Sequence, residues 1–149
     1  MAIHISHSPA ETEELGASWG RGAERGSIIA LSGELGAGKT RLVKGIARGL
    51  GINEGVHSPT FALINIYAGG RLPLFHLDLY RLETRDQIIG AGLEEYFQPA
   101  GVAVIEWAER WFGPAGSADQ PADGVKLRRV EILVQGDNER KIVYVDTGT

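Results

Sequence analysis

Residues Gly33 to Thr40 read GELGAGKT, a complete phosphate-binding loop (Walker A) of the form G-x-x-x-x-G-K-[ST]. Before this loop, the apolar run IIAL at 28–31 predicts a strand that is buried on both faces of a parallel sheet. After it, apolar residues recur at helical spacing as far as Leu50, and Gly51 is a stop signal, which predicts a helix over about 39–50. The loop therefore lies between a strand and a helix, where glycine backbone N–H groups can surround a phosphate at the positive end of the helix.

Two side chains of the loop have specific tasks in this motif. Lys39 is expected to contact the β- and γ-phosphates of a nucleoside triphosphate, and Thr40 to ligate the magnesium ion that accompanies the nucleotide. The alternative is a glycine-rich turn that matches the pattern by accident, and the strand and helix on either side argue against it. The loop therefore predicts nucleotide binding.

Length and composition limit what the rest of the chain can be. The 149 residues, 43% of them hydrophobic, are expected to form a single domain with one sheet and covering helices. Cysteine is absent, which excludes disulfides and thiolate metal sites. The chain shows neither a signal-peptide pattern nor a membrane-length apolar run, so we expect a soluble cytoplasmic protein. A net charge of -4 argues against broad electrostatic binding of nucleic acid, so we expect contact with RNA to go through a partner.

Local signals predict an α/β fold with a mostly parallel central sheet and added antiparallel hairpins. Ser8 as N-cap, Pro9 at the first helical position and Glu11 in a capping box predict a helix that ends near residue 21. The other predicted elements are strands at 27–33 and 101–105, a hairpin of 61–67 with 72–80, a short helix at 82–90, a flexible loop at 113–124 and a C-terminal hairpin of 125–134 with 140–145.

Acidic residues follow or interrupt two of these strands. Glu106 comes directly after the apolar run 102–105, which is the usual setting of the second acidic motif of phosphate-loop enzymes; a strand-end acid facing solvent is the alternative. Asp78 alternates with His76 and Tyr80 on one face of its strand. A hydrated antiparallel sheet face explains that alternation equally well, so the spacing leaves both interpretations of Asp78 open.

Other candidate residues have a structural interpretation that the spacing favours. Ser58 and Thr60 flank a proline before a strand, where they can form a phosphate-sensing switch but more commonly cap turns. Trp107 and Trp111 are one helical turn apart, a spacing that favours core packing over base stacking. His57 and His76 have no metal-ligand partner at a useful spacing, so no zinc site is predicted.

Four ordered motifs together resemble one family. GELGAGKT at 33–40, SPTF at 58–61, HLDLYRL at 76–82 and IEW at 105–107 are similar to the motifs of TsaE, the ATPase subunit of bacterial tRNA threonylcarbamoyladenosine biosynthesis. The resemblance extends from about residue 8 to residue 111. It implies a single P-loop ATPase domain over 1–149, with a P-loop NTPase-like three-layer sandwich, that uses ATP and Mg²⁺. It also implies two partners, a carbamoyltransferase subunit and its paralogous partner of the TsaD and TsaB type, which with this chain modify the adenosine next to the tRNA anticodon.

The resemblance also implies roles for individual residues. Lys39, Asp78 and Glu106 match catalytic positions, with Thr40, Glu106 and Asp78 at the metal. The nucleotide contacts that it implies are Leu35, Gly36, Ala37, Gly38, Lys39, Thr40, Thr12, Ser58, Thr60 and Glu109. Arg41 departs from the family, which usually carries a second Thr at this position. Because of the resemblance, a role for Asp78 in hydrolysis or in organising the metal is favoured over the hydrated-face interpretation.

Two other functions remain as alternatives. One is a small-molecule kinase that uses the same loop, although the short chain offers no obvious lid domain. The other is a nucleotide-binding interaction module that hydrolyses nothing.

Overall fold

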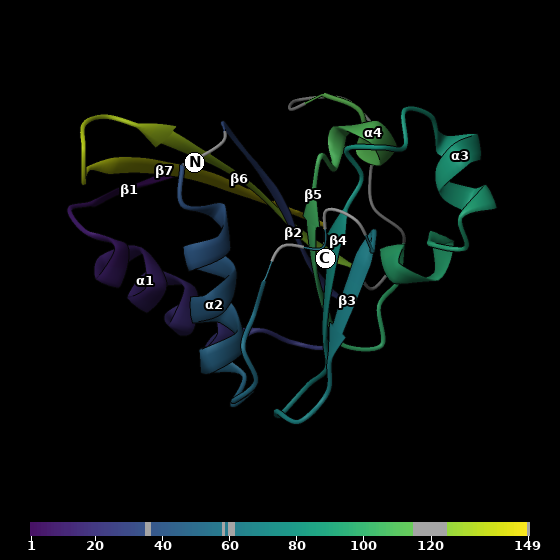
Figure 1. The fold of residues 1–149 in the computed structure, drawn as a ribbon, viewed down its shortest axis with the longest axis horizontal. Coiled ribbons are helices and arrows are strands. Elements are labelled where there is room, and N and C mark those ends of the chain that lie inside the picture. Colours follow the sequence, from purple (N-terminus) through teal and green to yellow (C-terminus); the bar gives the residue numbers. More distant parts are fainter. Residues whose placement is uncertain (35–36, 58, 60–61, 115–124, 149) are drawn as a thin grey trace.

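A seven-stranded sheet with helices on both faces forms the centre of the computed structural model (Figure 1). The structure describes residues 1–34, 37–57, 59, 62–114 and 125–148. The expectations for Leu35, Gly36, Ser58 and Thr60, and for most of the 113–124 loop, lie outside the described residues. Among the described residues, no helix combines the length and the apolar composition needed to cross a membrane.

The sheet is mixed, and its four central strands are parallel. The strands are β1 (Ala2–Ser6), β2 (Ser27–Gly33), β3 (Ile64–Tyr67), β4 (Leu74–Asp78), β5 (Val102–Glu106), β6 (Lys126–Val134) and β7 (Arg140–Gly148), in the spatial order β1-β7-β6-β2-β5-β4-β3. Three strand pairings are parallel, and three are antiparallel. Both predicted hairpins are confirmed, and they add antiparallel strands to the predicted parallel centre, so the sheet as a whole is mixed.

The helices form one layer on each side of the sheet. They are α1 (Pro9–Gly22), α2 (Lys39–Gly49), α3 (Arg85–Gly90), the 3-10 helix η1 (Glu94–Phe97) and α4 (Glu109–Phe112). Successive residues of a strand point to opposite faces. Ile29 and Leu31 of β2 therefore pack in the core under α2, whereas Ile28 and Ala30 pack in the core on the side of α3, η1 and α4. Burial on both faces explains why this strand is a continuous apolar run.

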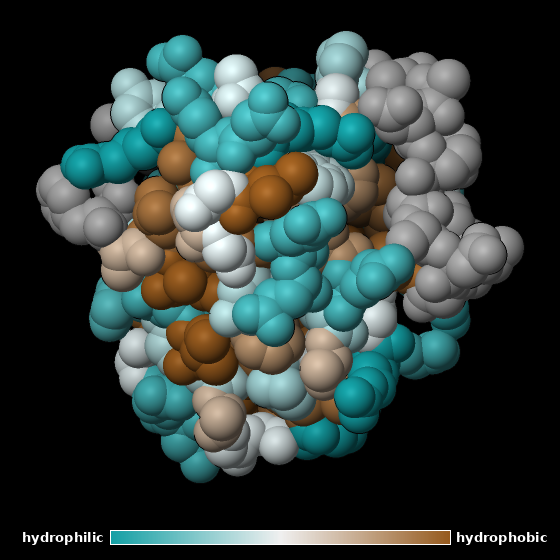
Figure 2. All heavy atoms as spheres, turned by 90° about the vertical axis from the view of Figure 1, so that its right-hand side faces the viewer, coloured by the Kyte–Doolittle hydropathy of each residue, from teal (hydrophilic) through white to brown (hydrophobic). Residues whose placement is uncertain are grey.

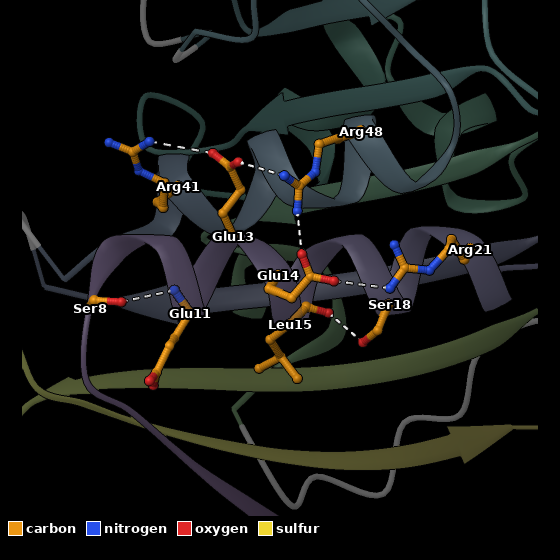
Figure 3. Close-up of polar contacts among 9 residues, drawn as sticks. All are labelled: Ser8, Glu11, Glu13, Glu14, Leu15, Ser18, Arg21, Arg41 and Arg48. Atoms are coloured by element: carbon orange, nitrogen blue, oxygen red, sulfur yellow. Dashed lines mark hydrogen bonds and ion pairs between the residues drawn. The ribbon is translucent and has the colours of Figure 1, made fainter.

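The predicted start of α1 is confirmed, with one difference. The Ser8 hydroxyl accepts a hydrogen bond from the backbone N–H of Glu11 (3.1 Å; Figure 3). The Glu11 carboxylate accepts from the backbone N–H of His7 (2.7 Å), one residue before the N-cap that a capping box would use. Strand β1, which precedes this helix, was not predicted. It pairs with β7 at the edge of the sheet, and local sequence carries little signal for such a distant pairing.

Glycines bring α1 and α2 into close backbone contact. Gly16 and Gly20 of α1 face Gly45 and Gly49 of α2, and a methyl group at any of these four positions would overlap a backbone carbonyl oxygen of the other helix. Ion pairs between the same helices lie on the outside (Figure 3), where Arg48 pairs with the carboxylates of Glu13 (3.3 Å) and Glu14 (2.7 Å). The helix that follows the phosphate loop is therefore held firmly against α1.

The opposite side of the molecule, with α3 and the edge strand β3, shows hydrophobic atoms scattered among hydrophilic ones (Figure 2). The exposed large hydrophobic residues of these two elements are Ile66 and Ile89. Scattered exposure of this kind is normal for a protein surface.

Candidate nucleotide-binding site

Three neighbouring parallel strands end beside the phosphate loop. Leu31 of β2, Glu106 of β5 and Asp78 of β4 are paired in register across the sheet. Strand β2 continues to Gly33, and α2 begins at Lys39. In open α/β sheets, ligands bind at the carboxyl ends of the parallel strands. The loop and both predicted acids are therefore at the edge of the sheet where such a site is expected.

The Glu106 carboxylate lies between two nitrogen groups. Its Oε1 atom is 3.5 Å from Lys39 Nζ, and its Oε2 atom accepts a hydrogen bond from His76 Nε2 at 2.8 Å. Glu106 is only 7% exposed and His76 is fully buried. The structure thus brings together two of the predicted catalytic residues, and the interpretation of Glu106 as a solvent-facing acid is wrong.

Asp78 is also buried, close to this cluster. Its Oδ1 atom accepts a hydrogen bond from the backbone N–H of Tyr80 at 3.0 Å. The interpretation of this strand face as hydrated is wrong for His76 and Asp78, which are 0% and 7% exposed, whereas Tyr80, beyond the end of β4, is exposed. Because burying a carboxylate is costly even when it has partners, two buried acids beside a phosphate loop favour a functional role.

The two acids have pKa values shifted in opposite directions. Burial by itself would raise the pKa of Glu106, but the hydrogen bond from His76 and the electrostatic attraction of His76 and Lys39 together lower it. Burial raises the pKa of Asp78, the hydrogen bond from Tyr80 opposes this, and the nearby charge of Glu106 adds to the rise. Glu106 is therefore held as a carboxylate that can bind a cation, while Asp78 is the more basic carboxylate of the two.

His76 is a site residue to which the sequence analysis gave no role of its own, although it lies in the HLDLYRL motif and on the polar face with Asp78. Its Nδ1 atom is buried without a hydrogen-bond partner among the described residues. Its position two residues before Asp78, on the same face of β4, was the available signal. The contact with Glu106 joins residues 30 positions apart, so it required the strand register.

A small pocket opens beside Lys39. It has a volume of about 130 Å³ and is lined by Leu31, Ser32, Gly33, Lys39, Trp107 and Glu109. Glu109 thus lies near the loop, as the resemblance implies. Trp107 has a left-handed backbone conformation (φ +61°), and its ring contacts the ring of Tyr80 and the guanidinium of Arg110. Both tryptophans pack partly against the core, as predicted, and Trp111 stacks on Phe97 with ring centroids 4.3 Å apart.

The remaining predicted residues lie in different surroundings. Thr40 is exposed in the first turn of α2. Thr12 is buried, its hydroxyl is 2.7 Å from that of Ser6, and it is not among the described residues that line the small pocket. Arg41 points to α1, where it pairs with Glu13 at 3.3 Å (Figure 3). The departure at Arg41 therefore adds a contact between helices.

A larger cavity of about 580 Å³ lies at the opposite end of β2, between α1, β6 and β7. Its lining includes Trp19, Arg128 and Tyr144 and none of the predicted site residues. The smaller pocket is the candidate nucleotide site, because the phosphate loop and the carboxyl ends of the parallel strands meet there.

The donor set fits magnesium bound together with a nucleotide. Among the described residues, no three His, Asp or Glu side chains are arranged to hold a metal ion by themselves. Magnesium usually takes one or two protein oxygens and fills its remaining positions with phosphate oxygens and water. The Glu106 carboxylate and the exposed Thr40 hydroxyl are oxygen donors of the required kind.

A phosphate-loop sequence between β2 and α2, with buried carboxylates at the ends of β4 and β5, defines an α/β protein of the phosphate-loop class. A family model described as "Threonylcarbamoyl adenosine biosynthesis protein TsaE" matches residues 6–142, and the chain belongs to this TsaE family.

Individual relatives agree with the family model. The "tRNA threonylcarbamoyladenosine biosynthesis protein TsaE" of Bacillus subtilis is 38% identical over 143 residues, which cover 95% of this chain and 83% of the relative. The protein of the same name from a Nostoc species is 50% identical over 103 residues, 66% of this chain and 63% of the relative. A crystal structure of Bacillus subtilis YdiB is similar with a TM-score of 0.76 and 33% identity, over 99% of this chain and 86% of that chain.

Proposed function

We propose that the chain is a magnesium-dependent ATPase that supports threonylcarbamoyl transfer to the adenosine next to the tRNA anticodon. The observation that supports hydrolysis most directly is the pairing of Lys39 with the buried carboxylate of Glu106 at the edge of the parallel strands. The relatives are named for tRNA threonylcarbamoyladenosine biosynthesis, and this supports the biological role. The sheet would then be a P-loop NTPase core extended by two hairpins.

The residues divide the work of hydrolysis by their chemistry. Backbone N–H groups of 35–40 and the Lys39 ammonium hold the phosphates of ATP. Thr40 and Glu106 would hold magnesium, which would supply the Lewis-acid charge that stabilises the phosphoryl group. Asp78 orients the attacking water and accepts its proton, a task that suits a carboxylate with a raised pKa.

The hydrolysis cycle changes how tightly the chain binds its partner subunits. The partners are a carbamoyltransferase subunit and its paralogous partner of the TsaD and TsaB type, and tRNA contacts the complex through them in the cytoplasm. Nucleotide state changes the affinity of the chain for these subunits, as in other phosphate-loop switches. The turnover of the chain alone is therefore weak and is stimulated by the partners.

The test is ATP hydrolysis by the protein alone and with both transferase subunits and substrate tRNA. Lys39→Ala and Glu106→Ala should abolish stimulated turnover. Lys44→Ala, an exposed lysine on the same helix, and Glu131→Ala, an exposed acid on β6, are matched controls that should retain it. A rate that is unchanged by the partners would contradict the proposal.

One further variant separates the alternatives. Asp78→Ala should retain ATP binding and lose turnover if the chain is an ATPase. Retained turnover would remove Asp78 from the mechanism. Binding without turnover in the wild type would indicate a non-hydrolysing module, and transfer of phosphate to a small molecule would indicate a kinase.

A further inference from the structure

Arg140, the first residue of β7, connects the C-terminal hairpin to the phosphate loop. Its Nε atom donates a hydrogen bond to the backbone carbonyl of Ala37 (3.1 Å). Its Nη1 atom donates to the backbone carbonyls of Gly136 (2.8 Å) and Glu139 (3.0 Å) in the turn between β6 and β7. One guanidinium thus joins the turn beside it to a loop residue 103 positions away in the sequence.

The hairpin packs directly on the loop. In the register of β2 with β6, Gly33 pairs with Ile132, and β6 continues past the end of β2 to Val134. A methyl group at Gly33 would lie 2.9 Å from the Ile132 carbonyl oxygen and 3.4 Å from the Ala37 side chain. Strand pairing therefore fixes the β6–β7 turn, whose carbonyls bind Arg140, beside the phosphate loop.

The hydrogen bond to the Ala37 carbonyl also determines the direction of the Gly38 N–H. The Ala37 carbonyl and the Gly38 N–H belong to one planar trans peptide, so they point in opposite directions. A carbonyl held toward Arg140 turns the Gly38 N–H away from the hairpin. Gly38 has a positive φ (+102°) and can adopt several backbone conformations, so this peptide needs an external contact to hold one orientation.

We propose that Arg140 is a positioning residue that orients the Ala37–Gly38 peptide for phosphate binding. The inference deepens the proposed nucleotide site and rests on it. Arg140 acts through the backbone, with Nε and Nη1 donating at the same time from a rigid planar group. Lysine has the same charge but lacks this fixed fork, so it cannot replace arginine here.

The first test is ATP affinity by calorimetry for Arg140→Gln and Arg140→Lys. Both should bind ATP about tenfold more weakly than wild type, the effect expected for losing one hydrogen bond from a charged donor. The matched control is Arg128→Gln, because Arg128 lies on the same hairpin but bonds to Asp146 (2.6 Å) and stacks on Trp19. This control should lower the melting temperature and leave ATP affinity unchanged.

The second test needs no nucleotide. The ¹⁵N order parameter of the Gly38 amide in the nucleotide-free protein should fall in Arg140→Gln and stay at the wild-type value in Arg128→Gln. If the wild type does not bind ATP, the proposed function fails while this measurement still tests Arg140. An unchanged Gly38 amide, full recovery of affinity by lysine, or equal losses of affinity in both hairpin variants would each overturn the inference.

Discussion

Gly45→Ala should destabilise the protein, because the added methyl group would overlap the Glu13 carbonyl oxygen of α1. That oxygen belongs to a helix backbone and cannot rotate away, so the two helices must separate. Overpacking of this kind costs about 3 kcal/mol. Alanine regains about 1 kcal/mol in helix propensity. The net loss is about 2 kcal/mol, which lowers the melting temperature of a domain of this size by about 4–8 °C.

Gly22→Ala is the matched control for this measurement. Gly22 is the last residue of α1, and a methyl group there would meet no atom within 4 Å. The melting temperature of Gly22→Ala should equal or slightly exceed that of the wild type. Thermal unfolding followed by circular dichroism measures both variants. If Gly45→Ala is as stable as Gly22→Ala, the close contact of α1 with α2 is refuted.

The buried acids and their partners lead to three more predictions. Glu106→Gln should strengthen magnesium-free ATP binding about tenfold in calorimetry, because Lys39 loses the carboxylate with which phosphates must compete. An unchanged affinity would mean that the ion pair of Lys39 with Glu106 does not oppose ATP binding. His76→Gln, which keeps an N–H donor, should retain more magnesium-dependent ATP binding than His76→Leu, and equal losses would show that the hydrogen bond to Glu106 is dispensable. Asp78→Asn should raise the melting temperature at pH 7, because a raised folded-state pKa means that ionised Asp78 destabilises the fold above that pKa. The gain should vanish below the ordinary pKa of an aspartate, where Asp78 is protonated in both the folded and the unfolded protein. A gain that persists there would contradict the sign of the shift.

Signals within a few residues predicted most of the elements. The Ser8 cap, the apolar strand 28–31 and the stop at Gly51 each follow from rules that operate over one or two turns of chain, and the structure contains all three. The parallel core followed from apolar runs that are buried on both faces.

Contacts between distant residues could not be predicted in this way. The pairing of β1 with β7, the hydrogen bond of His76 to Glu106 and that of Arg140 to Ala37 all depend on strand register or on the path of the hairpin. For the same reason the burial of Asp78 could not be decided from alternation alone, because alternation shows which side chains share a face and not what covers that face.

The pair of Lys39 and Glu106 has a consequence for how the proposed site works. At 3.5 Å and an effective dielectric constant of about 20, two unit charges attract by about 5 kcal/mol before desolvation is counted. Phosphates that bind Lys39 must replace this attraction, and Glu106 is then left without its cation. His76 keeps the carboxylate in place, so the vacated Oε1 atom is available to a metal that arrives with the nucleotide. A nucleotide without its metal would leave a buried carboxylate partly uncompensated beside anionic phosphates. The arrangement therefore favours nucleotide and magnesium together over either alone.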